Sequence, residues 1–300
     1  MHAGGQPAGF IGLGAMGEPM ALNIAAAGIP LVVWNRTTAR CAAVAEAGAR
    51  VADSVDGVFA ACETVILMLA DGAAIDSVLD RGGATFAARV SDHTIVHMGT
   101  TSPSYSRGLE ADVISAGGRY VEAPVSGSRR PAEERQLVAM VAGGAEAVKA
   151  ASPLFDAMCR ATVACGAVPN ALVTKLAANV FLIALVTGLA EAFHFARHHD
   201  LDLERLAAVL NVGQMASPIS KVKTAKLLAG DLAEQASIAN VLENNRLIAE
   251  AANEAGIASP LIDVCHALYR ETLQLGLGEA DMIAVVEAIE QRTATVSRLT

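Results

Sequence analysis

The chain has 300 residues, of which 53% are hydrophobic and only 18% charged, and its formal net charge is −9. This composition excludes intrinsic disorder, because a disordered chain combines low hydrophobicity with high charge. The acidic balance argues against a nucleic-acid partner, since such binding depends on cations that neutralise phosphates. The longest apolar run, residues 180–190, is shorter than the roughly 18 residues that span a bilayer, so no membrane partner is expected.

The N-terminal segment has neither the basic region nor the apolar region of a secretion signal, and its first apolar run, beginning at Phe10, is typical of a strand. The five cysteines are an odd number and show no CxxC spacing, which is typical of reduced thiols. Both observations favour a cytoplasmic location.

The first half of the chain alternates short apolar runs with helical patterns. We expect strands at residues 8–12, 31–34, 64–69, 94–97 and 119–122, with helices at 16–27 and 39–47. Strands that alternate with helices in this way indicate βαβ units and a parallel sheet.

From residue 171 onward nearly every segment has a helical pattern, opening with an unusually long apolar helix over residues 171–199. Glycine and proline mark breaks between later helices at residues 213–218, 256–260 and 276–278. The length suits two domains. We predict an α/β N-terminal Rossmann domain with a doubly wound, mostly parallel sheet (1–168), joined by a long interdomain helix to an all-α C-terminal domain (169–300).

A glycine motif follows the first predicted strand and opens the first predicted helix. In the GxGxxG pattern the first glycine permits a tight turn, the second lets the backbone approach a pyrophosphate, and the third lets the helix pack closely on the strand. The free N–H groups of the helix N-terminus favour an anion. The motif, and the predicted dinucleotide site, consists of Gly12, Leu13, Gly14, Ala15, Met16 and Gly17.

The end of the second predicted strand indicates which dinucleotide is bound. Sites that prefer NAD usually place a carboxylate there for the ribose hydroxyls. This chain has Asn35, Arg36 and Thr37 instead, and Arg36 offers a planar set of donors to a 2′-phosphate. The expected cofactor is therefore NADP(H).

The segment from Gly9 to Gly17, followed by Asn23, resembles the opening of the β-hydroxyacid dehydrogenases, relatives of 6-phosphogluconate dehydrogenase and 3-hydroxyisobutyrate dehydrogenase. Three further segments match that family in order, and the resemblance covers about residues 9–290. The runs after Trp34 and from Ser128 onward are most similar to NADPH-dependent glyoxylate and succinic semialdehyde reductases.

The resemblance implies roles for particular residues. Lys175 and Asn179 match the catalytic KxxxN motif, and Thr100 matches the threonine beside the nicotinamide. The other implied site residues are Ser126, Gly127 and Ser128 for the substrate, and Leu69 and Ala70 for the cofactor.

Elementary chemistry agrees with this assignment of Lys175. Residues four apart share one face of a helix, so Lys175 and Asn179 lie on the same side. A lysine in an apolar helix is costly to bury as a cation, so its pKa tends downward. Such an amine can give a proton to a carbonyl oxygen as hydride reaches the carbon. The expected reaction is reduction of a small aldehyde or keto acid, a small-molecule carbonyl substrate, to the hydroxy acid.

One feature departs from the family pattern, and another has the spacing of a metal site. The family usually has Lys-Asp near the start of a late helix, where this chain has Glu243 and Asn244. If Glu243 lies at the substrate site, it disfavours a dianionic substrate, and a solvent-facing Glu243 is an equal alternative. His194 and His198 have the spacing of helical metal ligands, but no carboxylate or cysteine partner is evident, so no metal is expected.

Two other functions remain as alternatives. Imine reductases share this architecture and often the Asn-Arg-Thr run, but typically lack the lysine and the Pro-Val-Ser-Gly segment present here. A non-catalytic NADP-binding interaction module is disfavoured by Lys175 and Asn179.

The apolar fraction exceeds what one compact core needs, which indicates that helical domains pair in a homodimer or homotetramer.

Overall fold

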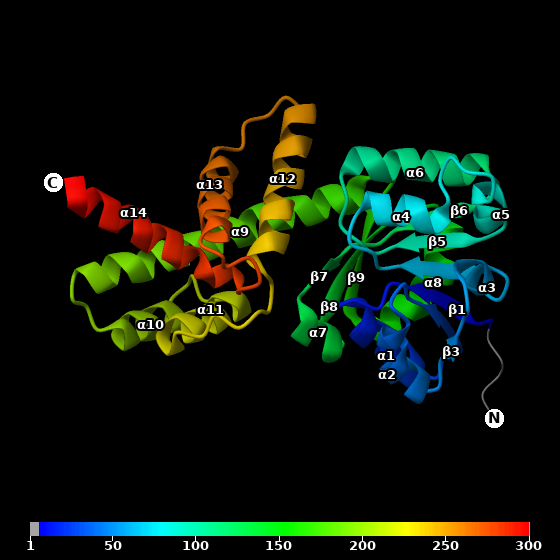
Figure 1. Cartoon of the computed structure of the whole chain (residues 1–300), viewed down its shortest axis with the longest axis horizontal. Helices are drawn as coiled ribbons and strands as arrows, with labels where there is room; N and C mark the ends of the chain where they lie inside the picture. Colours follow the sequence, from blue (N-terminus) through cyan, green and yellow to red (C-terminus); the bar gives the residue numbers. More distant parts are fainter. Residues whose placement is uncertain (1–5, 300) are drawn as a thin grey trace. The chain divides into compact units, whose positions relative to one another are not determined.

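The computed structural model describes residues 6–299, and side chains up to residue 295. The chain divides into two compact units, Met1–Lys175 and Leu176–Thr300 (Figure 1). The long helix α9 (Asn170–His198) begins in the first unit and continues into the second.

The first unit is built on one nine-stranded sheet whose central part is parallel. The strand order is β3-β2-β1-β4-β5-β6-β8-β7, and β9 pairs with β8. Strands β1 to β6 pair in parallel, whereas β8 runs antiparallel to β6 and β7. The strands are β1 (Ala8–Ile11), β2 (Leu31–Trp34), β3 (Arg50–Val51), β4 (Thr64–Leu67), β5 (Thr94–His97), β6 (Arg119–Glu122), β7 (Val125–Ser126), β8 (Leu137–Gly143) and β9 (Cys159–Gly166).

Helices cover both faces of this sheet, as the doubly wound prediction requires (Figure 1). Successive strand residues point to opposite faces, so Phe10 and Val33 belong to one core cluster and Ile11 and Val32 to another. The helices are α1 (Gly17–Ala26), η1 (Thr38–Cys41), α2 (Ala42–Glu46), α3 (Val55–Phe59), α4 (Gly72–Leu79), α5 (Phe86–Val90), α6 (Pro103–Ser115), α7 (Arg129–Glu133) and α8 (Ala145–Met158).

The second unit is helical, which confirms the predicted fold class. Its helices after α9 are α10 (Leu203–Val212), α11 (Pro218–Ala229), α12 (Ile238–Glu254), α13 (Pro260–Gln274), η2 (Met282–Ala284) and α14 (Val285–Leu299). The predicted breaks at residues 213–218 and 256–260 separate successive helices, because proline begins the next helix in each case. Buried Ile183, Val186 and Phe193 of α9 pack in its core with Tyr269 of α13.

Helix α9 is the one helix among the described residues long and apolar enough to cross a membrane by length and composition alone. That criterion is weak, because a core helix also meets it, and about a third of the most apolar stretch of α9 is buried. Other side chains of α9 are exposed, among them Phe181 and Phe195, whose exposed fractions are 71% and 61%.

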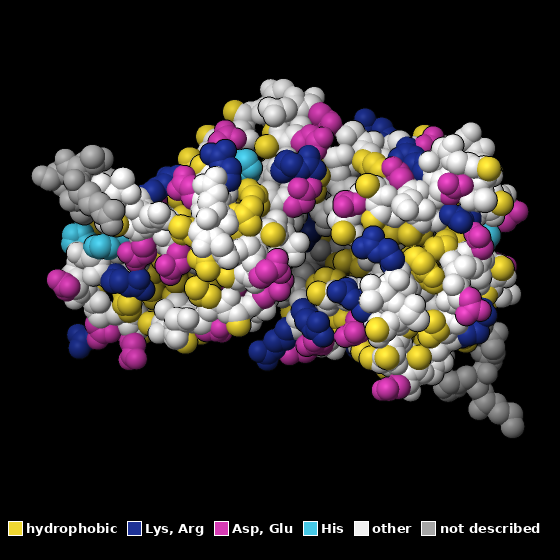
Figure 2. All heavy atoms as spheres, in the orientation of Figure 1, with side chains coloured by type: hydrophobic (Ala, Val, Ile, Leu, Met, Phe, Trp, Pro, Cys, Tyr) yellow, Lys and Arg dark blue, Asp and Glu magenta, His cyan; other side chains and the backbone are white. Residues whose placement is uncertain are grey.

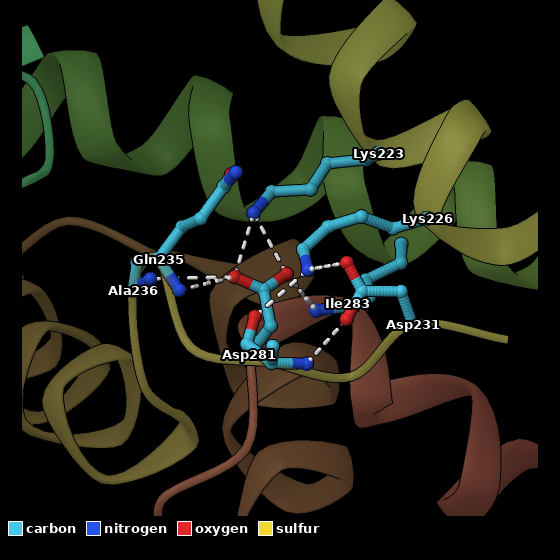
Figure 3. A network of polar contacts seen from close by, with 8 residues as sticks. Lys223, Lys226, Asp231, Gln235, Ala236, Asp281 and Ile283 are labelled. Carbon is cyan, nitrogen blue, oxygen red and sulfur yellow. Dashed lines mark hydrogen bonds and ion pairs between the residues drawn. The ribbon is translucent and has the colours of Figure 1, made fainter. Parts of the chain in front are cut away.

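A buried ion pair joins α11 to Asp281, which directly precedes η2 (Figure 3). Lys223 Nζ lies 2.7 and 2.8 Å from the two carboxylate oxygens of Asp281, and both side chains are buried. Asp281 also accepts backbone N–H bonds from Gln235, Ala236 and Ile283. The carboxylate therefore has a cation and three backbone donors to compensate its loss of water.

Candidate functional site

The glycine loop after β1 has the geometry that each of its glycines predicts. Gly12 has φ +102°, and a Cβ there would collide with the Met68 carbonyl. A Cβ on Gly17 would collide with the Gly12 carbonyl, so only glycine lets α1 pack this closely on β1. A Cβ on Gly14 would meet only Arg40 Nη1, at 3.8 Å. The space at Gly14 is open, as a loop that admits a pyrophosphate requires.

The N-terminus of α1 has no side-chain cap. Glu18 N donates to Gly14 O, Met20 N donates to Met16 O, and Pro19 has no N–H, so the candidate donors to an anion are the N–H groups of the loop that precedes this turn. Asn35, at the end of β2, holds the loop, because its Oδ1 accepts from Leu13 N at 2.9 Å while its Nδ2 donates to Thr37 O at 2.9 Å. Arg36 and Arg40 are exposed beside them. A hollow of about 150 Å³ opens here, with Trp34, Thr38, Cys41 and Asp53 among its lining residues.

The loops after β4 and β5 lie together at the same edge of the sheet. Met68 N donates to Ile11 O and Met98 N donates to Leu67 O, so the parallel pairing continues past the strand ends. A Cβ on Gly99 would lie 2.8 Å from the Leu69 carbonyl. The predicted cofactor residues Leu69 and Ala70 follow β4, which is next to β1, and Thr100 follows β5, which is next to β4. All three therefore lie at the carboxyl edge of the parallel strands, where open α/β sheets bind ligands.

The predicted substrate segment follows β6. Ser126 is exposed in β7, and Ser128 immediately precedes α7. Gly127 has φ +134°, and a Cβ there would lie 2.6 Å from Leu137 Cδ2, so this turn requires glycine. Asn23 of α1 supports the segment, since its Nδ2 donates to Ala132 O at 2.6 Å.

The two arginines of α7 have carboxylate partners. Arg129 Nε lies 2.9 Å from Glu133 Oε1, and Arg130 Nε lies 2.8 Å from Glu134 Oε1. Arg129 also lies 3.4 Å from Glu18 Oε1 of α1. All of these ion pairs are at least half exposed on the arginine side, so each is weak.

A buried polar chain joins β5, β6, α6 and the start of α9. His97 Nδ1 lies 2.8 Å from the Tyr120 hydroxyl, which lies 2.9 Å from Ser106 Oγ. Ser106 Oγ donates to Glu122, and the other oxygen of Glu122 accepts from Leu172 N at 2.8 Å. Burial raises the pKa of Glu122 and lowers that of His97 to about 4, so the imidazole is neutral.

Lys175 lies three residues after Leu172, in the first turns of α9. Its side chain is partly exposed, and desolvation lowers its pKa to about 8. The helix turn that carries this amine is held on the sheet through Glu122. An amine that exchanges its proton near neutral pH suits general acid–base chemistry.

In the second unit, Asn179 is buried and donates from Nδ2 to Asn244 Oδ1 at 2.7 Å. Asn244 is itself held by a bond from its Nδ2 to Asn240 O at 2.7 Å. Its neighbour Glu243 is exposed and binds Arg246 through both carboxylate oxygens, at 2.7 and 2.9 Å. At the position where the family usually has Lys-Asp, the asparagine of this chain contacts the KxxxN motif and Glu243 pairs within α12.

Glu122 and Asn244 have roles in the structure that the sequence did not assign to them. Glu122 had a signal, since a carboxylate at the end of an otherwise apolar strand needs a buried partner. For Asn244 the only signal in the sequence was its position next to Glu243.

Comparison with known proteins places both units in one family. The NAD-binding domain of 6-phosphogluconate dehydrogenase matches residues 7–166. A second domain, described as NAD-binding of NADP-dependent 3-hydroxyisobutyrate dehydrogenase, matches residues 170–289.

Similar proteins cover almost the whole chain. Glyoxylate/succinic semialdehyde reductase 1 of Arabidopsis thaliana is 30% identical over 94% of this chain and 98% of its own length. The cytokine-like nuclear factor N-PAC of Drosophila melanogaster is 28% identical over 93% of this chain but only 47% of its own length. The solved 3-hydroxyisobutyrate dehydrogenase of Mycobacterium tuberculosis shares the fold, with a TM-score of 0.84, 23% identity, and 95% and 99% of the two chains covered.

These matches confirm the predicted family, fold and cofactor class. The two domain matches and the reductase relative together show that this chain belongs to the β-hydroxyacid dehydrogenase family and is an NADP(H)-dependent oxidoreductase.

Proposed function

We propose that this chain reduces a small aldehyde or keto acid to the hydroxy acid with NADPH, and that Lys175 is the proton donor. The observation that carries the proposal is Lys175 itself, whose pKa is lowered to about 8 by desolvation. Its place in a KxxxN motif of this family adds the expected partner, Asn179. The relative that is a glyoxylate/succinic semialdehyde reductase supports a small carbonyl substrate.

Bound NADPH supplies the hydride in this reaction. The ammonium of Lys175 gives its proton to the carbonyl oxygen, which would otherwise become an alkoxide. Asn179 hydrogen-bonds to the substrate or to the lysine, and its amide is oriented by the 2.7 Å bond to Asn244. Arg36 and Thr37 bind the 2′-phosphate of the cofactor, since no carboxylate stands at the end of β2 to repel it.

The turn from Ser126 to Ser128 binds the carboxylate of the substrate through hydroxyl and backbone N–H groups. The nearby cations Arg129 and Arg130 have carboxylate partners in Glu133 and Glu134. A substrate with a single small anionic group suits such a turn better than a phosphorylated or dianionic one.

The experiment is a panel of substrates with NADPH and with NADH. Glyoxylate, succinic semialdehyde, other semialdehydes and cyclic imines are compared in wild type, Lys175→Ala and Lys149→Ala. We expect turnover of an aldehyde or keto acid with NADPH. We expect Lys175→Ala to lower kcat by about a thousandfold, which is within the usual range for a general acid, and to leave NADPH binding unchanged. Lys149, an exposed lysine of α8, is the matched control.

Particular outcomes would overturn the proposal. Turnover of cyclic imines alone would favour an imine reductase. Tight NADPH binding without any turnover would favour an interaction module. Substantial activity in Lys175→Ala would remove the lysine from the mechanism.

We place the enzyme in the cytoplasm as a homodimer or homotetramer assembled through its helical unit. Large apolar side chains of that unit are exposed, and Figure 2 shows hydrophobic side chains at its surface among acidic and basic ones. Among these exposed side chains are Phe181, Phe195, Val209, Val212 and Met215. Large exposed apolar side chains favour an interface with another protein chain.

A further inference from the structure

The C-terminal end of α9 and the middle of α14 bring two imidazoles and a carboxylate together. His194 Nδ1 and His198 Nε2 each lie 3.3 Å from Glu290 Oε2. All three donor atoms lie within 4.8 Å of one another. In a tetrahedral zinc site, with bonds of about 2.0–2.2 Å, neighbouring donor atoms are separated by about 3.3 Å. The spacing of this cluster is that of a set of ligands around one ion.

The ring of His194 has an oxygen partner for the nitrogen that does not face Glu290. Its Nε2 lies 2.8 Å from Thr293 Oγ1, whose hydroxyl donates to Ile289 O at 3.4 Å. When Nε2–H donates to this oxygen, the lone pair of His194 is on Nδ1, as a metal ligand requires. Metal-ligating histidines usually donate their other ring N–H to an acceptor in this way.

The atom that faces the cluster has no hydrogen-bond partner. Among the residues that the structure describes, His194 Nδ1 is a buried nitrogen without a hydrogen bond. Its 3.3 Å separation from Glu290 is longer than the roughly 2.7–2.9 Å of a charge-assisted hydrogen bond. With its lone pair on Nδ1, the imidazole would repel this carboxylate, and a cation between the two would remove that repulsion.

The carboxylate is oriented from its other side. Arg197 Nη1 lies 2.7 Å from Glu290 Oε1, so Oε2 is the oxygen turned toward the two imidazoles. The sequence did not predict a metal because it showed no clear carboxylate or cysteine partner for the two histidines. The fold supplies Glu290, which lies 92 residues after His198.

We propose that His194, His198 and Glu290 bind a divalent transition-metal ion, Zn²⁺ being the ion whose preferred nitrogen and oxygen ligands they match. The site ties the end of α9 to α14 within the helical unit. It is separate from the reaction centre, because His194 follows Lys175 by 19 residues, or about 28 Å of helix. Three protein ligands leave a fourth position for water.

The test uses the full chain without an affinity tag, freed of metal with a chelator. Cobalt is titrated first because its visible absorption reports tetrahedral nitrogen and oxygen ligation, and Zn²⁺ then competes it out. We expect one ion per chain and a higher Tm with Zn²⁺. We expect His194→Ala, His198→Ala and Glu290→Gln each to weaken binding by about 100-fold or more, and Thr293→Val by about tenfold.

His266→Ala is the matched control, since this histidine lies in α13 outside the cluster, and its binding should equal that of wild type. His198→Ala guards against misfolding, because that side chain is 49% exposed and its loss leaves the core intact. Absence of tetrahedral cobalt bands would overturn the proposal, as would cluster variants that bind like His266→Ala. Substrate turnover is measured separately, so failure of the metal site and failure of the proposed reaction are distinguishable.

Discussion

At the residue scale, the proton on Lys175 sets the expected pH dependence of the reaction. Desolvation lowers its pKa to about 8, so the amine is charged below that pH and neutral above it. Reduction needs the charged form as proton donor and oxidation needs the neutral form as acceptor. We predict that kcat/KM for reduction is level below pH 8 and falls about tenfold per unit above it, with the opposite slope for oxidation, in initial-rate profiles. A reduction profile that stays level to pH 10 would contradict this role.

Glu122 is a second residue with a measurable role, which is to position Lys175 rather than to react. Its carboxylate accepts from Leu172 N one turn before the lysine and from Ser106 Oγ. We predict that Glu122→Ala lowers the free energy of unfolding by about 1–3 kcal/mol, because a buried N–H loses its acceptor. We also predict at least a tenfold lower kcat, since small displacements of a catalytic group are costly.

Chemical denaturation and steady-state kinetics check both effects, and Glu122→Gln is the control. Its amide oxygen can still accept from Leu172 N and its amide can donate to Ser106, so we expect recovery of most activity. A Glu122→Ala variant that loses stability but keeps its kcat would show a purely structural role.

The sequence predicted the residues whose roles depend on local chemistry. Gly12 and Gly17 collide with neighbouring backbone if they gain a Cβ, and the motif alone signals this. Glu122 and Asn244 depend on partners 50 and 65 residues away, so nothing in their local sequence identifies those partners. For the same reason, the local sequence did not identify Glu290 as the partner of His194 and His198.

At the element scale, the parallel core of the sheet was predicted because its strands are short apolar runs between helices. The strands that were missed lack that signature. β3 (Arg50–Val51) has only two residues, and β9 (Cys159–Gly166) is mostly exposed. β8 (Leu137–Gly143) is the exception, since it is an apolar run that pairs in parallel with β9 across α8, and it is antiparallel to β6 and β7.

The contribution of the Lys223–Asp281 ion pair to the free energy of unfolding of the helical unit can be tested. Removing one partner of a buried pair leaves the other charge uncompensated, at a cost of about 3–5 kcal/mol. We predict a loss of that size for Lys223→Met in chemical denaturation. Lys226→Met is the control, because Lys226 is also buried but its partner Asp231 is half-exposed and can be hydrated when the lysine is lost, so we expect a smaller loss. Equal losses in the two variants would contradict the assignment.

At the scale of the whole molecule, the many apolar residues lie in two kinds of environment. One part fills the two faces of the sheet and the core of the helical unit. Another part stays at the surface, where Phe181 and Phe195 of α9 are 71% and 61% exposed. These two lie close to four helical turns apart, so they share one side of α9. A second copy of this chain is the partner that we expect to cover that side.

We therefore predict a particle of at least twice the 30.8 kDa chain mass by light scattering after size exclusion. Replacing both Phe181 and Phe195 by glutamate places charges in the expected interface and should shift the particle to the monomer, because unpaired buried charge is costly. Ile114→Glu is the matched control, since Ile114 of α6 is 57% exposed in the other unit and should leave the assembly intact. A wild-type particle of 30.8 kDa at micromolar concentration would contradict the prediction, as would a double variant that remains a dimer.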